Sequence, residues 1–160
     1  MMGARAVFEL GSGYGYSTAW FAWAVRDNGG GTVHHTEWEE ELSQQARQHL
    51  KTLGFADMVT YHVGEAVQAL RDTDGTFDPI FNDIDKHMYP EALPVIKEKL
   101  RSGGVLIADN VLMGGSVLRP ATGRGPGEGI REFTRTIAGD RDWAASIIPI
   151  RDGLLVARRH

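Results

Sequence analysis

The sequence contains no cysteine, which excludes disulfide bonds, catalytic thiolates and thiolate metal sites. It has no run of about 18 apolar residues, the length that a membrane-spanning helix requires. Lys and Arg number 17 against 21 Asp and Glu, a formal net charge of −4, so nucleic acid and membrane surfaces are not expected partners. The first apolar run begins at Ala6, too early for a secretory leader, and we therefore expect a cytoplasmic protein.

The composition is that of one ordinary globular domain. The chain has 160 residues, 42% of them hydrophobic and 24% charged, so residues 1–160 can bury one core. Strand-like apolar runs alternate with helical patterns, which predicts an α/β fold with a doubly wound, mostly parallel sheet. The predicted strands cover residues 6–10, 32–36, 58–63, 77–83 and 105–109, and the predicted helices cover 16–26, 39–53, 65–71, 89–100 and 130–138. Two last strands, 143–150 and 154–158, flank Arg151-Asp152-Gly153 and predict a C-terminal antiparallel hairpin at one edge.

A glycine-rich turn follows the first predicted strand. Glycines stand at 11, 13 and 15, directly after an apolar run that includes Glu9, and a helical pattern starts at Tyr16. Glycines allow a tight turn and the close approach of a ligand to the backbone, and the next helix begins with unpaired N–H groups. The dinucleotide fingerprint requires a glycine at its sixth position, where this chain has Tyr16. The spacing instead resembles motif I of the class I methyltransferases that use S-adenosylmethionine (SAM); a turn without a ligand is the alternative.

Polar side chains come just after three of the predicted strands, where ligands bind in a doubly wound sheet. Glu37 closes the second strand, where an acid can accept both hydroxyls of a cofactor ribose; a solvated acid is the alternative. Asp83 ends the fourth strand, and Asp109 and Asn110 end the fifth. Together they predict a site for a hard cation such as Mg²⁺, unless the two acids only cap helices. Lys86 could act as a base, since a nearby cation disfavours an ammonium, or could be an ordinary surface lysine.

Three segments together resemble the metal-dependent O-methyltransferases, the family of caffeoyl-CoA and catechol O-methyltransferases and their bacterial relatives. They read FELGSGYGYST at 8–18, FNDIDKHMYP at 81–90 and GGVLIADNVLMGG at 103–115. IREF at 130–133 and PIRDGLL at 149–155 match the C-terminal part of the family, so the similarity runs over essentially the whole chain. The resemblance implies a Rossmann-like, seven-stranded sheet in the order 3-2-1-4-5-7-6.

The resemblance also implies an activity and a set of site residues. The activity is that of a SAM-dependent, divalent-metal-dependent O-methyltransferase acting on a hydroxyl of a small catechol-like or phenolic acceptor. Lys86 would be the catalytic base, and the metal ligands for Mg²⁺, or for Ca²⁺ or Mn²⁺, would be Asp83, Asp109 and Asn110. The implied cofactor-binding residues are Gly11, Gly13 and Ser17 at the methionine part, Glu9 near its amino group, Glu37 at the ribose, Glu65 near the adenine, and Asp83.

Two other functions stay open. The family usually carries a helical segment before the first strand, and only a few residues precede that strand here. One alternative is therefore a non-catalytic or partner-dependent SAM-binding domain. The other is a nicotinamide-dependent oxidoreductase, which the glycine spacing disfavours. The expected partner is a small aromatic acceptor, and the glycine-rich stretch 114–129 together with the uncovered first strand suggests a homodimer.

Overall fold

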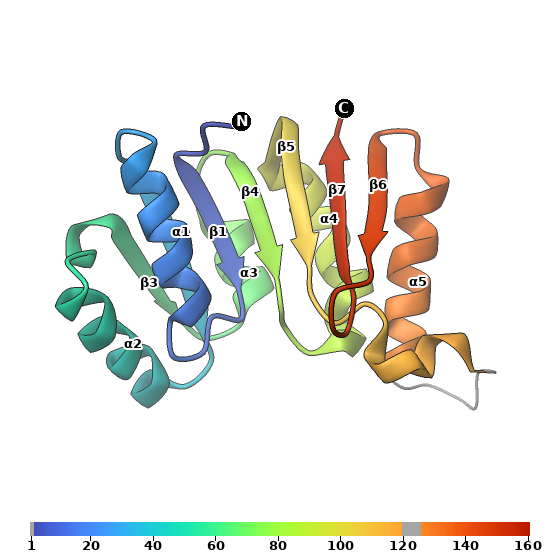
Figure 1. Ribbon diagram of the computed structural model, residues 1–160, viewed down its shortest axis with the longest axis horizontal. Helices are drawn as coiled ribbons and strands as arrows, with labels where there is room; N and C mark the ends of the chain where they lie inside the picture. The colour runs from blue at the N-terminus through green and yellow to red at the C-terminus, as the bar shows by residue number, and fades with distance from the viewer. Residues whose placement is uncertain (1, 120–125) are drawn as a thin grey trace.

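The computed structural model describes residues 2–119 and 126–160. Seven strands form one sheet in the order β3-β2-β1-β4-β5-β7-β6, which confirms the predicted order (Figure 1). The strands are β1 (Ala6–Leu10), β2 (Thr32–Glu37), β3 (Val59–Val63), β4 (Phe77–Asn82), β5 (Leu100–Ala108), β6 (Trp143–Ile148) and β7 (Leu154–Arg159). The helices are α1 (Tyr16–Asp27), α2 (Glu40–Thr52), α3 (Ala66–Asp72), α4 (Tyr89–Lys99) and α5 (Pro126–Gly139), with short 3₁₀ helices η1 (Ala56–Met58), η2 (Lys86–Met88) and η3 (Met113–Leu118).

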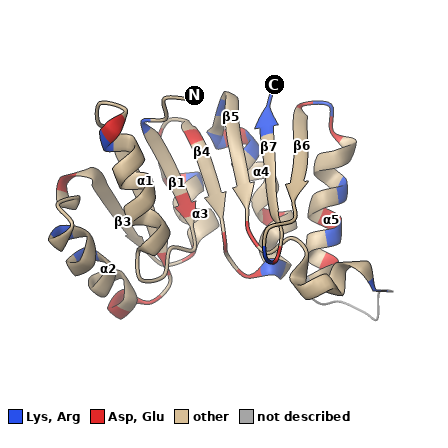
Figure 2. Cartoon of the chain, viewed as in Figure 1, with Lys and Arg blue, Asp and Glu red and all other residues tan. Residues whose placement is uncertain are grey.

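The first five strands run parallel, and β7 pairs antiparallel with both β5 and β6, as the hairpin signal predicted. Because parallel strands end at the same edge of a sheet, the residues that follow β1, β2, β4 and β5 are brought together. This carboxyl edge is the lower edge of the sheet in Figure 1. Figure 2 shows acidic residues along it, in the segments that follow the strands.

Alternate residues of β1 enter two different hydrophobic clusters, because successive side chains of a strand point to opposite faces. Val7 packs with Ala22 and Val25 of α1 on one face. Phe8 and Leu10 belong to the larger cluster on the other face, which includes residues of α3, α4 and α5. Figure 1 shows the same division, with α1 in front of the sheet and α3 and α4 behind it.

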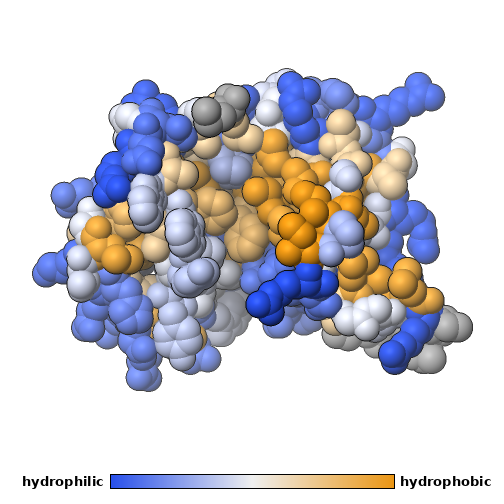
Figure 3. Space-filling model, in the orientation of Figure 1, coloured by the Kyte–Doolittle hydropathy of each residue, from blue (hydrophilic) through white to orange (hydrophobic). Residues whose placement is uncertain are grey.

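The front face of the sheet is apolar over β5, β7 and β6. Figure 3 shows hydrophobic residues gathered there, beside the area that α1 covers. Every residue of β6 after Trp143 is exposed, and Ile147 and Ile148 are 42% and 39% exposed. In the described ranges, no helix is long and apolar enough to cross a membrane.

Two predicted segments differ from the structure by more than two residues. Strand β5 begins at Leu100, so the glycines at 103 and 104, predicted to end a helix, lie inside the strand. A Cβ at Gly104 would lie 2.8 Å from the carbonyl oxygen of Asp78, so only glycine lets the two strands approach there. The stretch 114–129, predicted to be irregular, contains η3 and the first turn of α5, and its residues 120–125 lie outside the described residues.

Candidate functional site

The glycine-rich turn joins β1 to α1 and packs directly against the segment that follows β4. Gly11 has a φ of +82°, and a Cβ there would lie 2.8 Å from the carbonyl oxygen of Asp83. The backbone N–H of Asp83 donates to the carbonyl of Leu10 at 2.8 Å. Gly11 therefore satisfies both a left-handed backbone and a close contact between two parts of the carboxyl edge.

Thr36, near the end of β2, fixes the same turn. Its hydroxyl accepts the N–H of Gly11 at 3.0 Å and donates to the carbonyl of Glu9 at 2.8 Å. Its carbonyl accepts the N–H of Ser12 at 2.8 Å. Thr36 is fully buried. Sequence reasoning missed this residue, although its position next to Glu37 at a strand end was a signal.

A cavity of about 240 Å³ opens beyond the ends of β1 to β4. Its lining residues are Gly11, Thr36, Glu37, Trp38, Gly64, Glu65, Ala66, Ile84, Asp85 and Met88. Of the residues predicted to bind the cofactor, Gly11, Glu37 and Glu65 line the cavity. Asp85 and Met88 line it too and were not predicted, although Asp85 lies within the recognised 81–90 segment.

The two predicted acids at this cavity have different local contacts. Glu37 accepts the backbone N–H of Glu39 through Oε1 at 3.1 Å. Glu65 caps α3, because its two carboxylate oxygens accept the N–H groups of Val67 and Gln68 at 2.8 and 2.6 Å. Glu65 thus stabilises the first turn of α3 while it lines the cavity.

Glu9 lies beneath the turn and not at the cavity surface, since its side chain is fully buried. The Thr18 hydroxyl donates to Glu9 Oε2 at 2.5 Å and lies 3.1 Å from Nδ1 of His35. Burial raises the pKa of Glu9 from 4.5 to about 7, while hydrogen bonds from Ser17, Thr18 and Ser12 oppose the rise. Glu9 can therefore lose its proton near neutral pH.

Two more of the predicted cofactor residues, Gly13 and Ser17, lie in the glycine-rich turn and at the start of α1. Gly13 has a φ of +52°, and a Cβ there would meet no atom within 4 Å. Ser17 is in the first turn of α1, and its hydroxyl lowers the pKa of the Glu9 carboxyl. Neither residue lines the cavity described above.

Lys86 and Asp83 form an ion pair beside the cavity. The Lys86 ammonium donates to Asp83 Oδ1 at 2.6 Å and to the carbonyl of Ile84 at 3.2 Å. The Lys86 side chain is 14% exposed, so this charge is largely sheltered from water. Burial raises the pKa of Asp83, Lys86 opposes the rise, and the nearby charge of Asp109 adds to it. The structure thus brings the predicted base and two predicted metal ligands together.

Tyr89 ties the ends of β4 and β5 to each other. Its buried hydroxyl lies 2.8 Å from the carbonyl of Asn82 and 3.0 Å from that of Asp109. The N–H of Asp109 also donates to the Asn82 carbonyl at 3.1 Å. Asn110 follows with a φ of +55°, and its N–H donates to Asp109 Oδ1 at 2.7 Å. The last predicted ligand, Asn110, is therefore held in a left-handed turn beside Asp109.

The capping alternative for the two aspartates does not describe this site. The cap positions of the following helices η2 and η3 are Asp85 and Leu112, not Asp83 or Asp109. Within the described residues, no group of three His, Asp or Glu side chains could hold a metal ion. The predicted metal ligands Asp83, Asp109 and Asn110 include only two such side chains, and metal binding by them stays a prediction.

Comparison with known proteins gives the chain a family context. A family model described as O-methyltransferase matches residues 1–160. A Mycobacterium tuberculosis protein named as a probable O-methyltransferase is 32% identical over 161 residues, which cover 99% of this chain and 71% of that protein.

Two solved structures share the fold. One is the O-methyltransferase TomG from Streptomyces achromogenes, involved in tomaymycin synthesis and solved in complex with SAM; it is 32% identical, with a TM-score of 0.91 over 99% of this chain and 74% of that chain. The other is an O-methyltransferase from Bacillus cereus in complex with SAH, 31% identical, with a TM-score of 0.92 over 99% of this chain and 76% of that chain.

Proposed function

Because the chain belongs to the O-methyltransferase family, we propose that it transfers the methyl group of SAM to a hydroxyl of a small catechol-like or phenolic acceptor, with a divalent cation bound beside the acceptor. One observation carries the proposal. Ile84 and Asp85 line the same cavity as Gly11 and Glu37. Both lie between Asp83 and Lys86 in the sequence, so the ion pair of these two residues borders the cavity. A cofactor site and a base therefore lie side by side at one edge of the sheet.

The residues of the cavity fit SAM. Glu37 ends β2, the place from which an acid reaches a cofactor ribose, and its carboxylate lines the cavity. Ala66, Ile84 and Met88 offer apolar contacts for an adenine ring. Gly11, whose close contact with Asp83 leaves no room for a Cβ, places the turn after β1 at the cavity wall. SAM and SAH in the two similar structures support the same cofactor here.

The donor set fits a hard cation. Mg²⁺ is commonly bound by one or two carboxylates and keeps several waters, so Asp83, Asp109 and the Asn110 amide oxygen suffice without a third acid. Ca²⁺ or Mn²⁺ would accept the same oxygens. Tyr89 holds the two strand ends at a fixed separation, which is what a preformed cation site requires.

The roles of the residues follow from their positions. When bound, SAM would supply an electrophilic methyl group, and a cation held by Asp83, Asp109 and Asn110 would polarise the acceptor hydroxyl and disfavour a charged ammonium beside it. Lys86, as the neutral amine that remains after its ammonium has lost a proton to solvent, would receive the hydroxyl proton on Nζ as the general base. Asp83 keeps the Lys86 side chain oriented through the 2.6 Å contact, and Thr36 with Gly11 fixes the turn that faces the cofactor. Holding both reactants in place contributes much of the rate enhancement.

The proposal is tested by incubating the full chain with methyl-labelled SAM and a panel of catechols and phenols. We expect label in the phenolic ether of the product, identified by mass spectrometry. Fully methylated analogues of the same acceptors serve as controls and should stay unlabelled. SAM binding without transfer to any hydroxyl would refute the proposal and favour the non-catalytic alternative. Binding of a nicotinamide cofactor in place of SAM would favour the oxidoreductase.

A further inference from the structure

Helix α5 contacts three parts of the proposed catalytic edge through residues on its first two turns. We propose that two of them, Gly129 and Arg131, are positioning residues. They fix η2, which begins with Lys86, and η3 relative to each other. The inference rests on the proposed function, because it assigns these residues to the acceptor side of that site.

Gly129 lies against the backbone of Lys86. A Cβ at this position would be 2.6 Å from the carbonyl oxygen of Lys86 and 3.0 Å from Cα of His87. Gly129 is inside α5 and is not among the glycines with positive φ, so glycine is needed here for space and not for backbone conformation. Both contacting atoms belong to the main chain, which cannot turn aside as a flexible side chain can. A larger residue must therefore change the distance between α5 and η2, and with it the position of Lys86 relative to α5.

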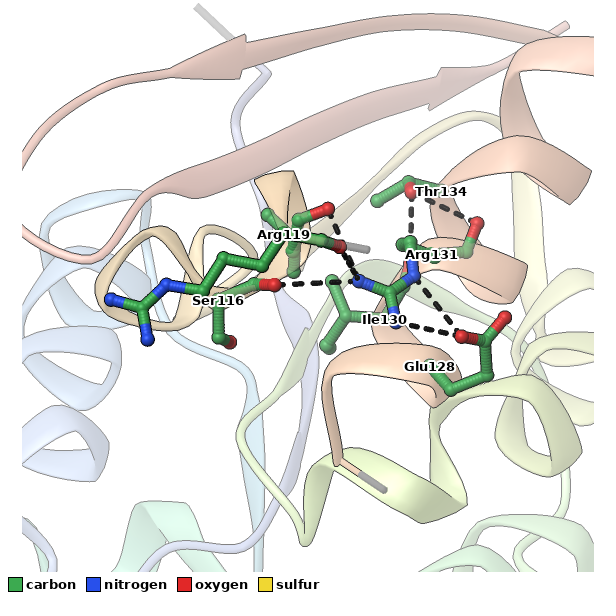
Figure 4. A network of polar contacts seen from close by, with 7 residues as sticks. Ser116, Arg119, Glu128, Ile130, Arg131 and Thr134 are labelled. Carbon is green, nitrogen blue, oxygen red and sulfur yellow. Dashed lines mark hydrogen bonds and ion pairs between the residues drawn. The ribbon is translucent and has the colours of Figure 1, made fainter. Parts of the chain in front are cut away.

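Arg131 holds the end of η3 (Figure 4). Its Nη1 lies 3.4, 3.2 and 3.3 Å from the carbonyl oxygens of Ser116, Val117 and Arg119. Its Nε and Nη2 donate to Glu128 Oε2 at 3.1 and 2.7 Å, which orients the guanidinium toward these carbonyls. The last carbonyls of a helix have no partner within it, and a cation beside them is favourable. The planar fork of arginine serves several acceptors at once, which lysine cannot do.

A third contact joins α5 to the ends of β4 and β5. Phe133 is fully buried and meets the Tyr89 ring edge to face, with centroids 5.1 Å apart. Tyr89 in turn reaches the carbonyls of Asn82 and Asp109. Ile130 is buried in the same hydrophobic cluster as Phe133 and Tyr89. One face of α5 is therefore anchored in the core, while other faces of the helix contact η2 and η3.

The two segments that α5 holds flank the proposed reaction centre. Helix η2 begins with Lys86, and η3 begins three residues after Asn110. The glycine-rich turn is fixed separately, by Thr36 of β2. A disturbance of Arg131 should therefore displace η3 on the acceptor side and leave SAM binding nearly unchanged. A disturbance of Gly129 should displace the base and, to a smaller extent, Met88 of the same helix, which lines the cofactor cavity.

The first test needs no activity and uses the full chain. Amide hydrogen exchange is compared by mass spectrometry between the wild type, Gly129→Ala and Arg131→Met. We expect faster exchange over residues 84–90 in Gly129→Ala and over 112–119 in Arg131→Met, with residues 6–15 unchanged. Gly139→Ala is the matched control, because a Cβ there meets no atom within 4 Å. Unchanged exchange, or an increase spread evenly over the chain, would overturn the inference.

The second test measures catalysis with SAM, Mg²⁺ and the acceptor that gives the highest rate. Gly129→Ala should lower kcat about tenfold or more and raise the Kd for SAM by a clearly smaller factor, because Met88 of η2 lines the cofactor cavity. Arg131→Met should raise the KM for the acceptor, and Arg131→Lys should recover only part of the loss. The exposed Arg135→Lys is the control and should match the wild type. Equal loss of SAM affinity and kcat, or no loss of either, would overturn the positioning role.

The two tests separate this inference from the proposed function. A wild-type chain that transfers no methyl group would refute the proposed function and the catalytic role of α5 with it. In that case the hydrogen-exchange pattern still decides whether Gly129 and Arg131 fix the two segments.

Discussion

Replacing Glu9 by Gln removes a buried acid with little change of shape, and we expect the variant to be more stable than the wild type above pH 7. Burial raises the pKa of Glu9 from 4.5 to about 7. The folded chain therefore binds this proton more tightly than the unfolded chain does. The stability that Glu9 contributes is fully present below pH 4.5 and is lost as the pH rises toward 7.

The size of the effect follows from that window. At about 1.4 kcal/mol for each pH unit, the interval from 4.5 to 7 corresponds to about 3 kcal/mol in the free energy of unfolding. Gln keeps an oxygen that can accept the Thr18 hydroxyl, now 2.5 Å from Glu9 Oε2, and does not titrate. The expected gain is therefore about 3 kcal/mol at pH 8 and close to zero near pH 4.

Urea denaturation of both proteins at several pH values between 4.5 and 8 measures this difference. His34, which is half-buried, and His35, which is buried, act in the opposite direction. Desolvation lowers the pKa of each to about 4, so the stability that they contribute is lost as the pH falls below 6.5. They are present in both proteins, so the difference between the two curves isolates Glu9. The exposed Glu41→Gln is the matched control. A difference that stays constant over the whole pH range would refute the reasoning.

Three further predictions concern the site. Gly11→Ala should lower the free energy of unfolding by about 2–4 kcal/mol, because it combines a positive φ with a 2.8 Å contact to Asp83; an unchanged urea midpoint would contradict this. Lys86→Met should reduce kcat about a hundredfold or more with the Kd for SAM nearly unchanged, by initial rates and titration calorimetry; undiminished turnover would remove Lys86 from the mechanism. Glu37→Ala should weaken SAM binding about tenfold. Glu65→Ala should weaken SAM binding and, unlike Glu37→Ala, should also lower the free energy of unfolding by about 1 kcal/mol, because it removes the cap of α3.

Much of the fold could be predicted because its signals are local. Apolar runs bounded by glycines and acids located all seven strands, and the order of the sheet came from the resemblance to one family. Strand β5 was predicted to start too late, since the pair Gly103-Gly104 normally ends an element. Here Gly104 allows β5 to pass the Asp78 carbonyl, a contact between strands that no local pattern reveals.

The candidate site was predictable only in part. Residues at strand ends, such as Glu37 and Asp109, could be located because parallel strands end at one edge. The burial of Glu9 depends on how α1 covers β1, and the capping role of Glu65 depends on the start of α3, which the sequence placed one residue early. The contacts of Gly129 and Arg131 join segments more than ten residues apart, so spacing along the chain could not indicate them.

Besides the roles of the site residues, the metal and the acceptor, the expected homodimer and the cytoplasmic location stay predictions. Sedimentation velocity of the purified chain over a range of concentrations tests the expected homodimer, and fractionation of cells that express it tests the cytoplasmic location.

The most direct test of metal-dependent transfer at Asp83, Asp109 and Asn110 is the initial rate of methyl transfer from labelled SAM to a catechol. The rate is measured with Mg²⁺, with an excess of chelator, and after Mg²⁺ is restored. We expect the chelator to abolish transfer, restored Mg²⁺ to recover it, and the Kd for SAM to stay nearly the same throughout. Full activity in the presence of the chelator would contradict a metal-dependent reaction at these residues.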